Sequence, residues 1–576
     1  MQTQLALGDA VGGNRAVPRI RDTAFAVAVV VLLVASLDGA RDLTHIDEQR
    51  YAEVSRVMAA PGGDWLVPHL NGEIYPDKPP LFFWAAAAAQ RLGVPLPEAA
   101  VLPSLFGAAV ALLATFGIAR RSMGKTAAIA SVVVLASALR FSSFAGRANL
   151  DALLTGFVVL SIFASVRGDT AERRRERVGW YAIGCVAAGF GILVKGPIAM
   201  AIPAVAIAGG RVLEGRGRSL ISFSTLAALA LALLPIAVWL LAAGHHVGWA
   251  YPQRIVMRHA VEHALGRVNH AGQPWDYLRI FPGAFLPGTL LLPAALARVR
   301  WRRPFDPGDA LAVAWFVGGF LLLSLIPVKR HHYLMPLYPG AALVVAGLFR
   351  DGAAPLAEHS RVGVLANAGR LAIAALGGAV GLFTLTAVLL IVAGLDPTAF
   401  GTGAHAATRA AALWRFAAAT PPSTLVAGAA LGAFLLLAAL VAAIARSGRW
   451  RGTALAGIAL TVMIGNARLV EPTLKTARGK RGFLESIAAE VGDGAIADYG
   501  RMHFAANWAL RRDVVPVLGD SASAARFLAD HAPGGAFLLA DRESLDRRGM
   551  PAGARVLRAW SRPLDSDLVL VGSAEE

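Results

Sequence analysis

The sequence predicts a polytopic α-helical membrane protein with about thirteen transmembrane helices and a small C-terminal α/β domain. Apolar residues make up 56% of the 576 residues and charged residues only 16%, and the mean hydropathy is +0.55. The apolar residues come in blocks of about twenty, the length of a helix that crosses a bilayer core. Arginines gather in the short segments between these blocks, as is typical of cytoplasmic loops.

Thirteen apolar segments are candidates for membrane spans, although several are short or interrupted by Gly and Pro. They cover residues 23–39, 99–119, 126–140, 150–166, 179–194, 197–210, 222–243, 284–298, 308–327, 334–349, 371–394, 424–445 and 453–467. No sustained alternation of apolar and polar residues indicates a lipid-facing barrel. The predicted division is a cytoplasmic N-terminus (1–22), a membrane domain (23–469) and a separate C-terminal domain (470–576).

The distribution of arginine predicts the orientation of the chain. With thirteen spans, all the arginine-rich loops fall on the same side as the N-terminus, and Lys and Arg accumulate in short cytoplasmic loops. These loops contain Arg120–Lys125, Arg167–Arg177, Arg211–Arg218, Arg298–Arg303, Arg350–Arg370 and Arg446–Arg451. The loops 40–98 and 244–283 and the C-terminal domain are therefore expected on the other, periplasmic side.

The C-terminal domain has the pattern of a small α/β fold. Segments 494–499, 514–518, 535–540 and 567–571 are short apolar runs of the kind found in buried strands. Residues 521–531 between them have the spacing of an amphipathic helix.

Composition also excludes some partners and sites. The formal charge of +17 would suit nucleic acid, but it lies in the short loops between apolar blocks, so we expect no nucleic-acid partner. The one cysteine, Cys185, lies inside an apolar run. It leaves no disulfide framework and no thiolate metal site.

Two acidic positions on the periplasmic side are candidates for catalysis. The pair Asp47-Glu48 follows the first span, and Asp151 lies at the outer end of the fourth. Either position could supply a general base or an orienting carboxylate, as paired acids do in other enzymes. Either Asp could instead be a helix N-cap, with Asp47 starting a helix over 48–58. The sequence leaves both interpretations open.

Three cationic positions on the same side could meet a phosphate. Lys78 is followed by Pro79-Pro80, which favours a fixed point charge over a snorkelling lysine. Lys195 lies at a hairpin tip before Gly196-Pro197, where a plain turn explains it nearly as well. The run Lys329-Arg330-His331-His332-Tyr333 opposes the positive-inside trend and suits an anionic lipid phosphate.

Four motifs resemble one known family. They are Asp47-Glu48-x-Arg50-Tyr51-Ala52-Glu53, Asp77-Lys78-Pro79-Pro80-Leu81 with Trp84, Lys195-Gly196-Pro197, and Lys329 to Pro336. Together they resemble the C-type glycosyltransferases of the superfamily of lipid A aminoarabinose transferases and protein O-mannosyltransferases. The resemblance covers residues 23–340 and implies the C-type glycosyltransferase fold.

The resemblance implies an inverting transfer of a sugar from a polyprenyl-phosphate donor to an envelope acceptor such as lipid A. The reaction would take place at the periplasmic face of the bacterial inner membrane. The family's catalytic base corresponds to Asp47 and its second acid to Asp151. Its contacts to the carrier phosphate correspond to Lys78, Tyr333 and Arg267.

No cofactor is required by this chemistry, although the resemblance suggests a divalent metal. Metal ligands of the aminoarabinose enzyme correspond to Asp77 and His263, which would suit Zn²⁺ or Mg²⁺. Asp77 is shorter than the usual family residue at its position. The run Arg330-His331-His332 is also more basic than in those enzymes, which suggests a different sugar or acceptor.

Two other classes of protein fit the composition. A transporter or flippase of lipid-linked sugars would show an inverted repeat or a charge near the centre of a span, and the sequence has neither. A membrane sensor would concentrate its titratable groups in the C-terminal domain, whereas here they concentrate in the first periplasmic loop.

Overall fold

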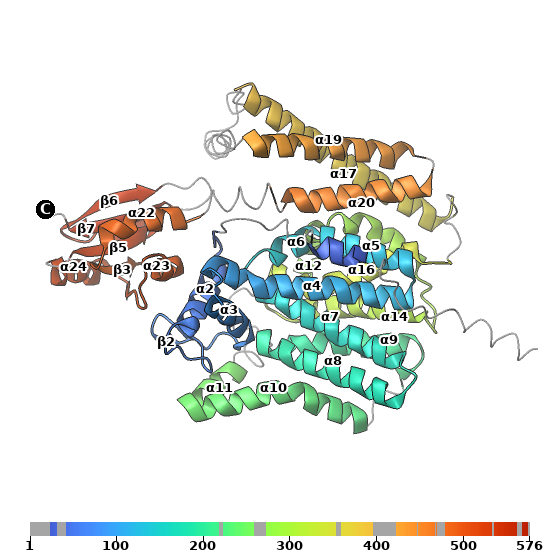
Figure 1. Ribbon diagram of the computed structural model, residues 1–576, viewed down its shortest axis with the longest axis horizontal. Helices are drawn as coiled ribbons and strands as arrows, with labels where there is room; N and C mark the ends of the chain where they lie inside the picture. Colours follow the sequence, from blue (N-terminus) through green and yellow to red (C-terminus); the bar gives the residue numbers. More distant parts are fainter. Residues whose placement is uncertain are drawn as a thin grey trace, which may run out of the picture.

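The computed structural model describes most of the chain as a helical bundle with a smaller α/β unit beside one end (Figure 1). The described residues are 24–31, 42–217, 223–257, 272–352, 357, 359–394, 422–445, 447–466, 468, 479–532, 535–560 and 567–573. The bundle buries one large apolar core, and the α/β unit has two smaller cores of its own.

Apolar helices of 7 to 32 residues form the bundle, and many of them run side by side in Figure 1. They are α4 (Leu96–Ser122), α5 (Lys125–Ser137), α6 (Leu139–Ala145), α7 (Leu150–Asp169), α8 (Arg174–Lys195), α9 (Ile198–Leu213), α10 (Phe223–Val247), α13 (Leu292–Arg298), α14 (Pro307–Val313), α15 (Gly319–Leu325), α16 (Tyr338–Ala346), α17 (Arg361–Val392), α19 (Pro422–Ile444) and α20 (Gly448–Gly465). The other helical pieces of the bundle are α11 (Ala250–Val256), α12 (Asp276–Ala284), η3 (Gly288–Leu291), η4 (Ala314–Gly318), η5 (His331–Leu337) and η6 (Gly347–Phe349).

The chain is a multi-pass helical membrane protein. Among the described residues, eight helices are long and apolar enough to cross a membrane, or up to ten if each of two bent helix pairs is one span. Each of the thirteen predicted segments falls on helical residues, although only 24–31 of the first segment is described. The segments 126–140 and 284–298 fall in helix pairs that are bent by 70° and 106°. Two of these helices, α9 and α20, are short. The number of crossings therefore stays a prediction.

Close backbone contact between α4 and α7 fixes the helix that carries Asp151. A Cβ on Gly107 would collide with the backbone of Ala152 and Leu153, and one on Gly156 would lie 2.7 Å from the Gly107 Cα. Small residues at a crossing let two membrane helices approach this closely. Ser104 on α4 adds hydrogen bonds of 2.9 Å with the N–H and the carbonyl of Asn149, one turn before the contact.

The arginine-rich loops meet at one end of the bundle, as the predicted orientation requires. Arg350 donates to Asp306 and to the Ser122 carbonyl, which joins three loops that lie far apart in sequence. Asp351 accepts from the N–H of Thr126 at 3.2 Å, and Arg211 donates to Asp169 at 3.0 Å. The basic loops thus gather on one side, and the predicted site residues lie at the other end of their helices.

The α/β unit contains a five-stranded sheet with the order β4-β3-β5-β7-β6. Strands β4, β3 and β5 are parallel, and β7 and β6 pair antiparallel beyond them. The strands are β3 (Ala495–Tyr499), β4 (Val517–Leu518), β5 (Ala536–Asp541), β6 (Ala554–Trp560) and β7 (Leu568–Ser573). All but β6 lie at the predicted strand segments, and α24 (Ser521–Asp530) matches the predicted helix.

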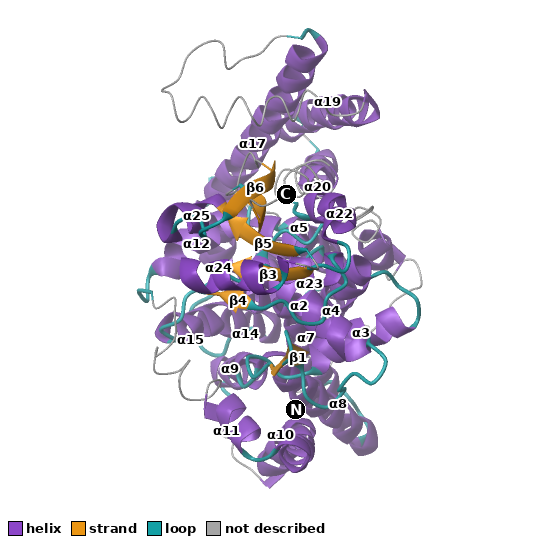
Figure 2. Cartoon of the chain, turned by 90° about the vertical axis from the view of Figure 1, so that its left-hand side faces the viewer, coloured by secondary structure: helices purple, strands orange, loops and turns teal. Residues whose placement is uncertain are grey.

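Helices cover both faces of this sheet (Figure 2). One face packs against α22 (Arg481–Val491) and α23 (Phe504–Ala509), and the other packs against α24 and α25 (Arg542–Arg548). Burying both faces is the usual arrangement for a sheet with parallel strands.

The α/β unit contacts the segment that precedes α4. This segment contains α2 (Ile46–Ala59), the hairpin β1 (His69–Leu70) and β2 (Glu73–Ile74), and α3 (Leu81–Arg91). Asn71 at the hairpin turn accepts from the Val515 N–H at 2.8 Å and donates to the Val515 carbonyl at 3.0 Å. Arg56 on α2 pairs with Asp513 at 3.0 Å. The helix that carries Asp47 is therefore held from both the bundle and the α/β unit.

Candidate functional site

The N-terminus of α2 places Asp47 in the first helical turn. His45 is the N-cap: its ring accepts from the Asp47 N–H at 3.2 Å, and its own N–H donates to Glu48 at 3.1 Å. This reciprocal pair is a capping box. The alternative that Asp47 itself caps a helix over 48–58 is wrong, because the helix begins two residues earlier and a different side chain caps it.

The Asp47 carboxylate is surrounded by cations. Arg50, one turn later on α2, donates to it, and Arg330 Nη1 lies 3.4 Å from its Oδ2. Burial opposes the charge on Asp47, but the charges of Arg50, His45 and Arg330 outweigh burial and hold the pKa of this carboxyl below its usual value. Asp47 is therefore ionised at neutral pH and can accept a proton or a hydrogen bond.

Asp151 forms a buried ion pair with Lys195. The Lys195 Nζ lies 2.5 and 2.6 Å from the two carboxylate oxygens, and the Asp151 side chain is only 4% exposed. The N-cap of α7 is Asn149, whose side chain accepts from the Asp151 N–H at 2.7 Å. The interpretation of Asp151 as an N-cap is therefore wrong too, and Lys195 is more than the tip of a turn.

Further side chains connect this pair to Asp47. The Lys195 ammonium lies 4.0 Å from the centre of the Tyr333 ring, and the His332 Nε2 lies 3.9 Å from Asp151. The charge of Lys78 acts on Asp151, and the charges of Asp47 and Arg330 act on Lys195. The structure thus gathers Asp47, Asp151, Lys78, Lys195 and Tyr333 from four separate segments into one cluster.

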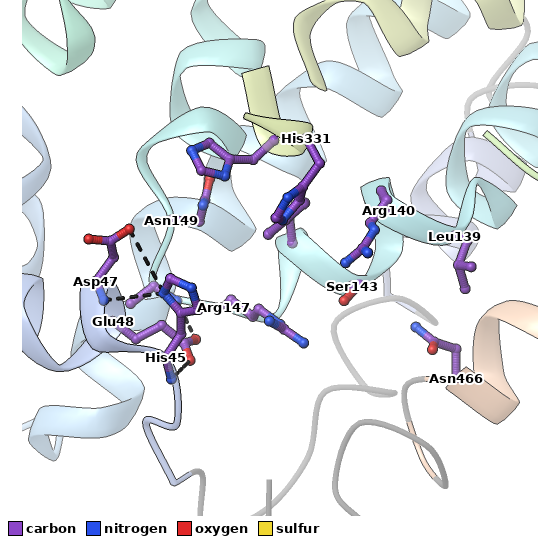
Figure 3. Close-up of a pocket in the computed structure, with 13 residues that line it drawn as sticks. His45, Asp47, Glu48, Leu139, Arg140, Ser143, Arg147, Asn149, His331 and Asn466 are labelled. Carbon is purple, nitrogen blue, oxygen red and sulfur yellow. Dashed lines mark hydrogen bonds and ion pairs between the residues drawn. The ribbon is translucent and has the colours of Figure 1, made fainter. Parts of the chain in front are cut away.

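A pocket of about 410 Å³ opens beside Asp47 (Figure 3). Its walls come from the start of α2, from α6, from the link before α7, from η5 and from the end of α20. The lining residues are His45, Asp47, Glu48, Leu139, Arg140, Ser143, Phe144, Arg147, Ala148, Asn149, His331, His332 and Asn466. A molecule bound in this pocket could therefore contact the Asp47 carboxylate.

Two predicted site residues have other contacts in the structure. Both oxygens of Glu48 accept backbone N–H groups, from His45 at 3.1 Å and from Ala148 at 3.3 Å, so this carboxylate joins α2 to the link before α7. Its role as a catalytic acid stays a prediction. Lys329 donates to three carbonyls at the end of α15, including that of Ser324 at 2.7 Å. The ammonium of Lys329 is therefore directed at a helix end, and its role at a carrier phosphate stays a prediction.

The predicted metal site is only partly described. Asp77 lies 3.9 Å from a guanidinium nitrogen of Arg50, which occupies one side of the carboxylate with a positive charge. His263 and Arg267 lie outside the described residues. Within the described ranges, no three His, Cys, Asp or Glu side chains gather as a metal site would require. The metal site therefore stays a prediction, and the reaction proposed below has no step through a metal.

The prediction from sequence did not single out Arg140 and Arg147 or assign a role to Arg50. No pattern in the sequence separates the first two from the other arginines on the predicted periplasmic side, such as Arg56 and Arg254. The signal for Arg50 is its position three residues after Asp47 on one helix face. Phe504 of the α/β unit lies 5.8 Å from the Arg50 guanidinium, and no sequence pattern announces that contact.

Comparison with known proteins gives matches over most of the chain. A family model described as dolichyl-phosphate-mannose-protein mannosyltransferase matches residues 77–241. Undecaprenyl phosphate-alpha-4-amino-4-deoxy-L-arabinose arabinosyl transferase from Edwardsiella ictaluri is 30% identical over 64% of this chain and 64% of that protein. A second relative, arabinosyl transferase 1 of the same description from Sodalis glossinidius, is 31% identical to this chain, and the match covers 65% of each protein. The chain thus spans slightly less than two thirds of the length of these relatives.

A solved structure shares the fold over nearly the whole length. ArnT from Cupriavidus metallidurans bound to undecaprenyl phosphate superposes with a TM-score of 0.71 and 20% sequence identity, and the match covers 96% of this chain and 98% of that one. These findings confirm the resemblance inferred from the motifs: the chain has the fold and the sequence relatives of the C-type glycosyltransferases in the aminoarabinose-transferase and protein O-mannosyltransferase-like superfamily.

Proposed function

We propose that this chain is an inverting glycosyltransferase of the bacterial inner membrane. It moves a sugar from a polyprenyl-phosphate donor to an envelope acceptor such as lipid A, at the periplasmic face. The observation that carries the proposal is the Asp47 carboxylate, which borders an open pocket and contacts the cations Arg50 and Arg330. The names of the relatives, which specify an undecaprenyl-phosphate sugar, support the donor class.

Asp47 would act as the base. An oxygen of the acceptor forms a bond to the anomeric carbon, and the bond from that carbon to the carrier phosphate breaks. The phosphate leaves with the electron pair, and the proton of the acceptor oxygen passes to the Asp47 carboxylate. Because attack and departure occur on opposite faces of the carbon, the configuration inverts.

Lys78, Lys195 and Tyr333 would meet the leaving phosphate. Fixed cations placed where negative charge develops stabilise a transition state more than mobile water does. Asp151 holds Lys195 through the buried ion pair, so its role is to position that ammonium. Exclusion of water from the site would limit hydrolysis of the donor.

The proposal is tested with purified protein in vesicles that contain a polyprenyl-phosphate sugar and lipid A. We expect release of polyprenyl phosphate that requires the acceptor, and a product with the opposite anomeric configuration. A transporter or flippase would move the intact donor across the vesicle membrane and release no polyprenyl phosphate. Release without any acceptor would indicate hydrolysis and would also contradict the proposal.

Orientation and span number are part of the same proposal. We infer thirteen spans, a cytoplasmic N-terminus and a periplasmic α/β unit, supported by the gathering of arginine-rich loops at one end of the bundle. A reporter fused after Leu570 that works only in the cytoplasm would overturn this orientation.

A further inference from the structure

One row of side chains on α2 leads from the pocket to the α/β unit. Side chains three residues apart on a helix are neighbours, and Asp47, Arg50, Glu53 and Arg56 follow this spacing. Arg50 donates to Asp47 at the pocket end of the row. At the other end, Arg56 makes two hydrogen bonds of 2.9 Å to the buried Glu53 and pairs with Asp513 of the α/β unit at 3.0 Å. The helix that carries the proposed base is thus tied to the α/β unit.

The Arg50 guanidinium contacts two aromatic rings. Its central carbon is 5.8 Å from the centre of the Tyr51 ring, which is buried in the core of the bundle, and 5.8 Å from the centre of the Phe504 ring. Both distances are within the range of a cation–π contact. Phe504 comes from the α/β unit, so each part of the molecule supplies one ring. Because the guanidinium is planar and rigid, rings beside it restrict where its donors can point.

Phe504 is the first residue of α23, the helix of the α/β unit that lies beside α2 (Figure 1). Among the described residues, Ala505 and Trp508 of α23 pack into the core on that face of the sheet, whereas the half-buried Phe504 ring belongs to neither core of the unit. One turn after Phe504, Asn507 donates to Asn71 of the β1–β2 hairpin at 3.0 Å. Docking of the α/β unit on the segment before α4 therefore accounts for the position of this ring, and packing of the unit's own core does not.

We propose that Phe504 is a positioning residue for the transfer reaction, because its ring holds the Arg50 guanidinium against the Asp47 carboxylate. This inference rests on the proposed function and gives the α/β unit a part in it. A base must be held in place relative to the reacting carbon, and a misplacement of about 1 Å can cost about a hundredfold in rate. Without the ring, Arg50 can turn away and leave Asp47 with less support on that side. The donor phosphate, which we place at Lys78 and Lys195, does not depend on this contact.

The test separates the ring of Phe504 from its volume. Phe504→Leu and Phe504→Met keep a bulky apolar side chain without a ring, whereas Phe504→Tyr keeps the ring. For the full-length protein in vesicles with a polyprenyl-phosphate sugar and lipid A, we expect kcat to fall about tenfold in both ringless variants and to stay near the parent value in Phe504→Tyr. Binding of polyprenyl phosphate should be unchanged in all three variants. Thermal unfolding in detergent checks that each variant is folded.

A double-mutant cycle tests whether the ring acts through Arg50. Arg50→Lys keeps a positive charge near Asp47 but removes the planar group that the ring orients. If the effect of the ring passes through Arg50, Phe504→Leu should lower kcat much less in the Arg50→Lys background than in the parent. Equal losses in both backgrounds would show two independent effects and would overturn the proposal.

Phe527→Leu is the matched control. Phe527 is also half-buried in the α/β unit, but it lies on α24, on the opposite face of the sheet from α23. This variant should turn over like the parent. The proposal is overturned by parent-like kcat in Phe504→Leu and Phe504→Met, by an equal loss in Phe527→Leu, or by a Phe504→Tyr variant as slow as Phe504→Leu. A parent that releases no polyprenyl phosphate with any acceptor would instead refute the proposed function.

Discussion

Two regions of this molecule contain carboxylates paired with cations, but only one of these regions adjoins a pocket. In the bundle, Asp47 and Asp151 meet Arg50, Arg330 and Lys195, and Asp47 borders a pocket. In the α/β unit, Asp498 and Asp541 meet His503, and these three side chains are 0, 2 and 1% exposed. The first group is open to a ligand and the second is closed.

The closed cluster lies where open α/β sheets often bind ligands, at the carboxyl ends of adjacent parallel strands. Asp498 and Asp541 are near the ends of β3 and β5. There the His503 ring lies 2.8 Å from Asp498 and 3.3 Å from Asp541, and Arg501 pairs with Asp541 as well. The His503 side chain thus occupies the position where a ligand would bind. A buried group of charges therefore does not by itself identify a binding site; an adjoining cavity is also needed.

The largest expected effect is on the fold and comes from the Asp151–Lys195 pair. Lys195→Ala leaves the Asp151 charge buried without its partner and should cost about 3–5 kcal/mol of stability. Thermal unfolding in detergent measures this loss. Lys195→Ala combined with Asp151→Ala should recover most of the stability and none of the activity. Recovery of both would mean that the pair only supports the fold.

Lys78 tests the open cluster of Asp47 and Asp151, because its charge acts on Asp151. Lys78→Ala should raise the KM for the donor and lower kcat, together by about a hundredfold in kcat/KM, because the charge meets the carrier phosphate in both ground and transition states. Lys78→Arg should restore only part of the lost kcat/KM, since a planar guanidinium does not replace a point charge. Parent-like kinetics for Lys78→Ala would leave this residue as a snorkelling anchor.

His503→Gln tests whether the closed cluster is structural. We expect the α/β unit to lose about 1–3 kcal/mol, seen as faster hydrogen exchange in residues 479–532, with transfer largely retained. Burial opposes the charge on His503, but Asp498 and Asp541 raise its pKa. The stabilisation is therefore full below the unfolded pKa of histidine and is lost as the pH rises through the folded pKa. Loss of transfer with intact exchange protection would contradict a purely structural role.

A smaller effect, on the pH dependence of the reaction, is expected when a cation near Asp47 is removed. Arg330→Gln removes one of the cations that lower the pKa of this carboxyl, so that pKa should rise. The acid limb of the kcat/KM profile should move to higher pH, because the base becomes protonated sooner as the pH falls. Arg167→Gln, far from Asp47, should leave the profile unchanged, and an unmoved profile in both variants would exclude Asp47 as the group that titrates.

The sequence was sufficient to predict the helices and most strands of the sheet, because both follow from local patterns of apolar residues. Blocks of about twenty apolar residues predicted the helices, and apolar runs predicted β3, β4, β5 and β7. Strand β6 was missed because Arg555 and Arg558 interrupt its apolar pattern. Bends such as that between α5 and α6 cannot be seen in hydropathy.

The site was harder to predict, since its pairs join distant segments. Asp151 and Lys195 are 44 residues apart, and Arg330 and Asp47 are 283 apart. Each residue could be named from its motif, but no spacing in the sequence shows which cation meets which acid. The N-cap alternatives for Asp47 and Asp151 could be rejected only in the structure, where His45 and Asn149 take those positions.

The most direct test of the account is the transfer rate of Asp47→Asn beside that of Asp169→Asn. Asp169 is also a paired carboxylate, bonded to Tyr181 at 2.6 Å and Arg211 at 3.0 Å, but it lies at the arginine-rich end of α7. Release of polyprenyl phosphate to an acceptor should fall by about two to four orders of magnitude in Asp47→Asn, with donor binding retained, because the base is lost while its shape is kept. Asp169→Asn should turn over like the parent. Parent-like turnover by Asp47→Asn would contradict the account.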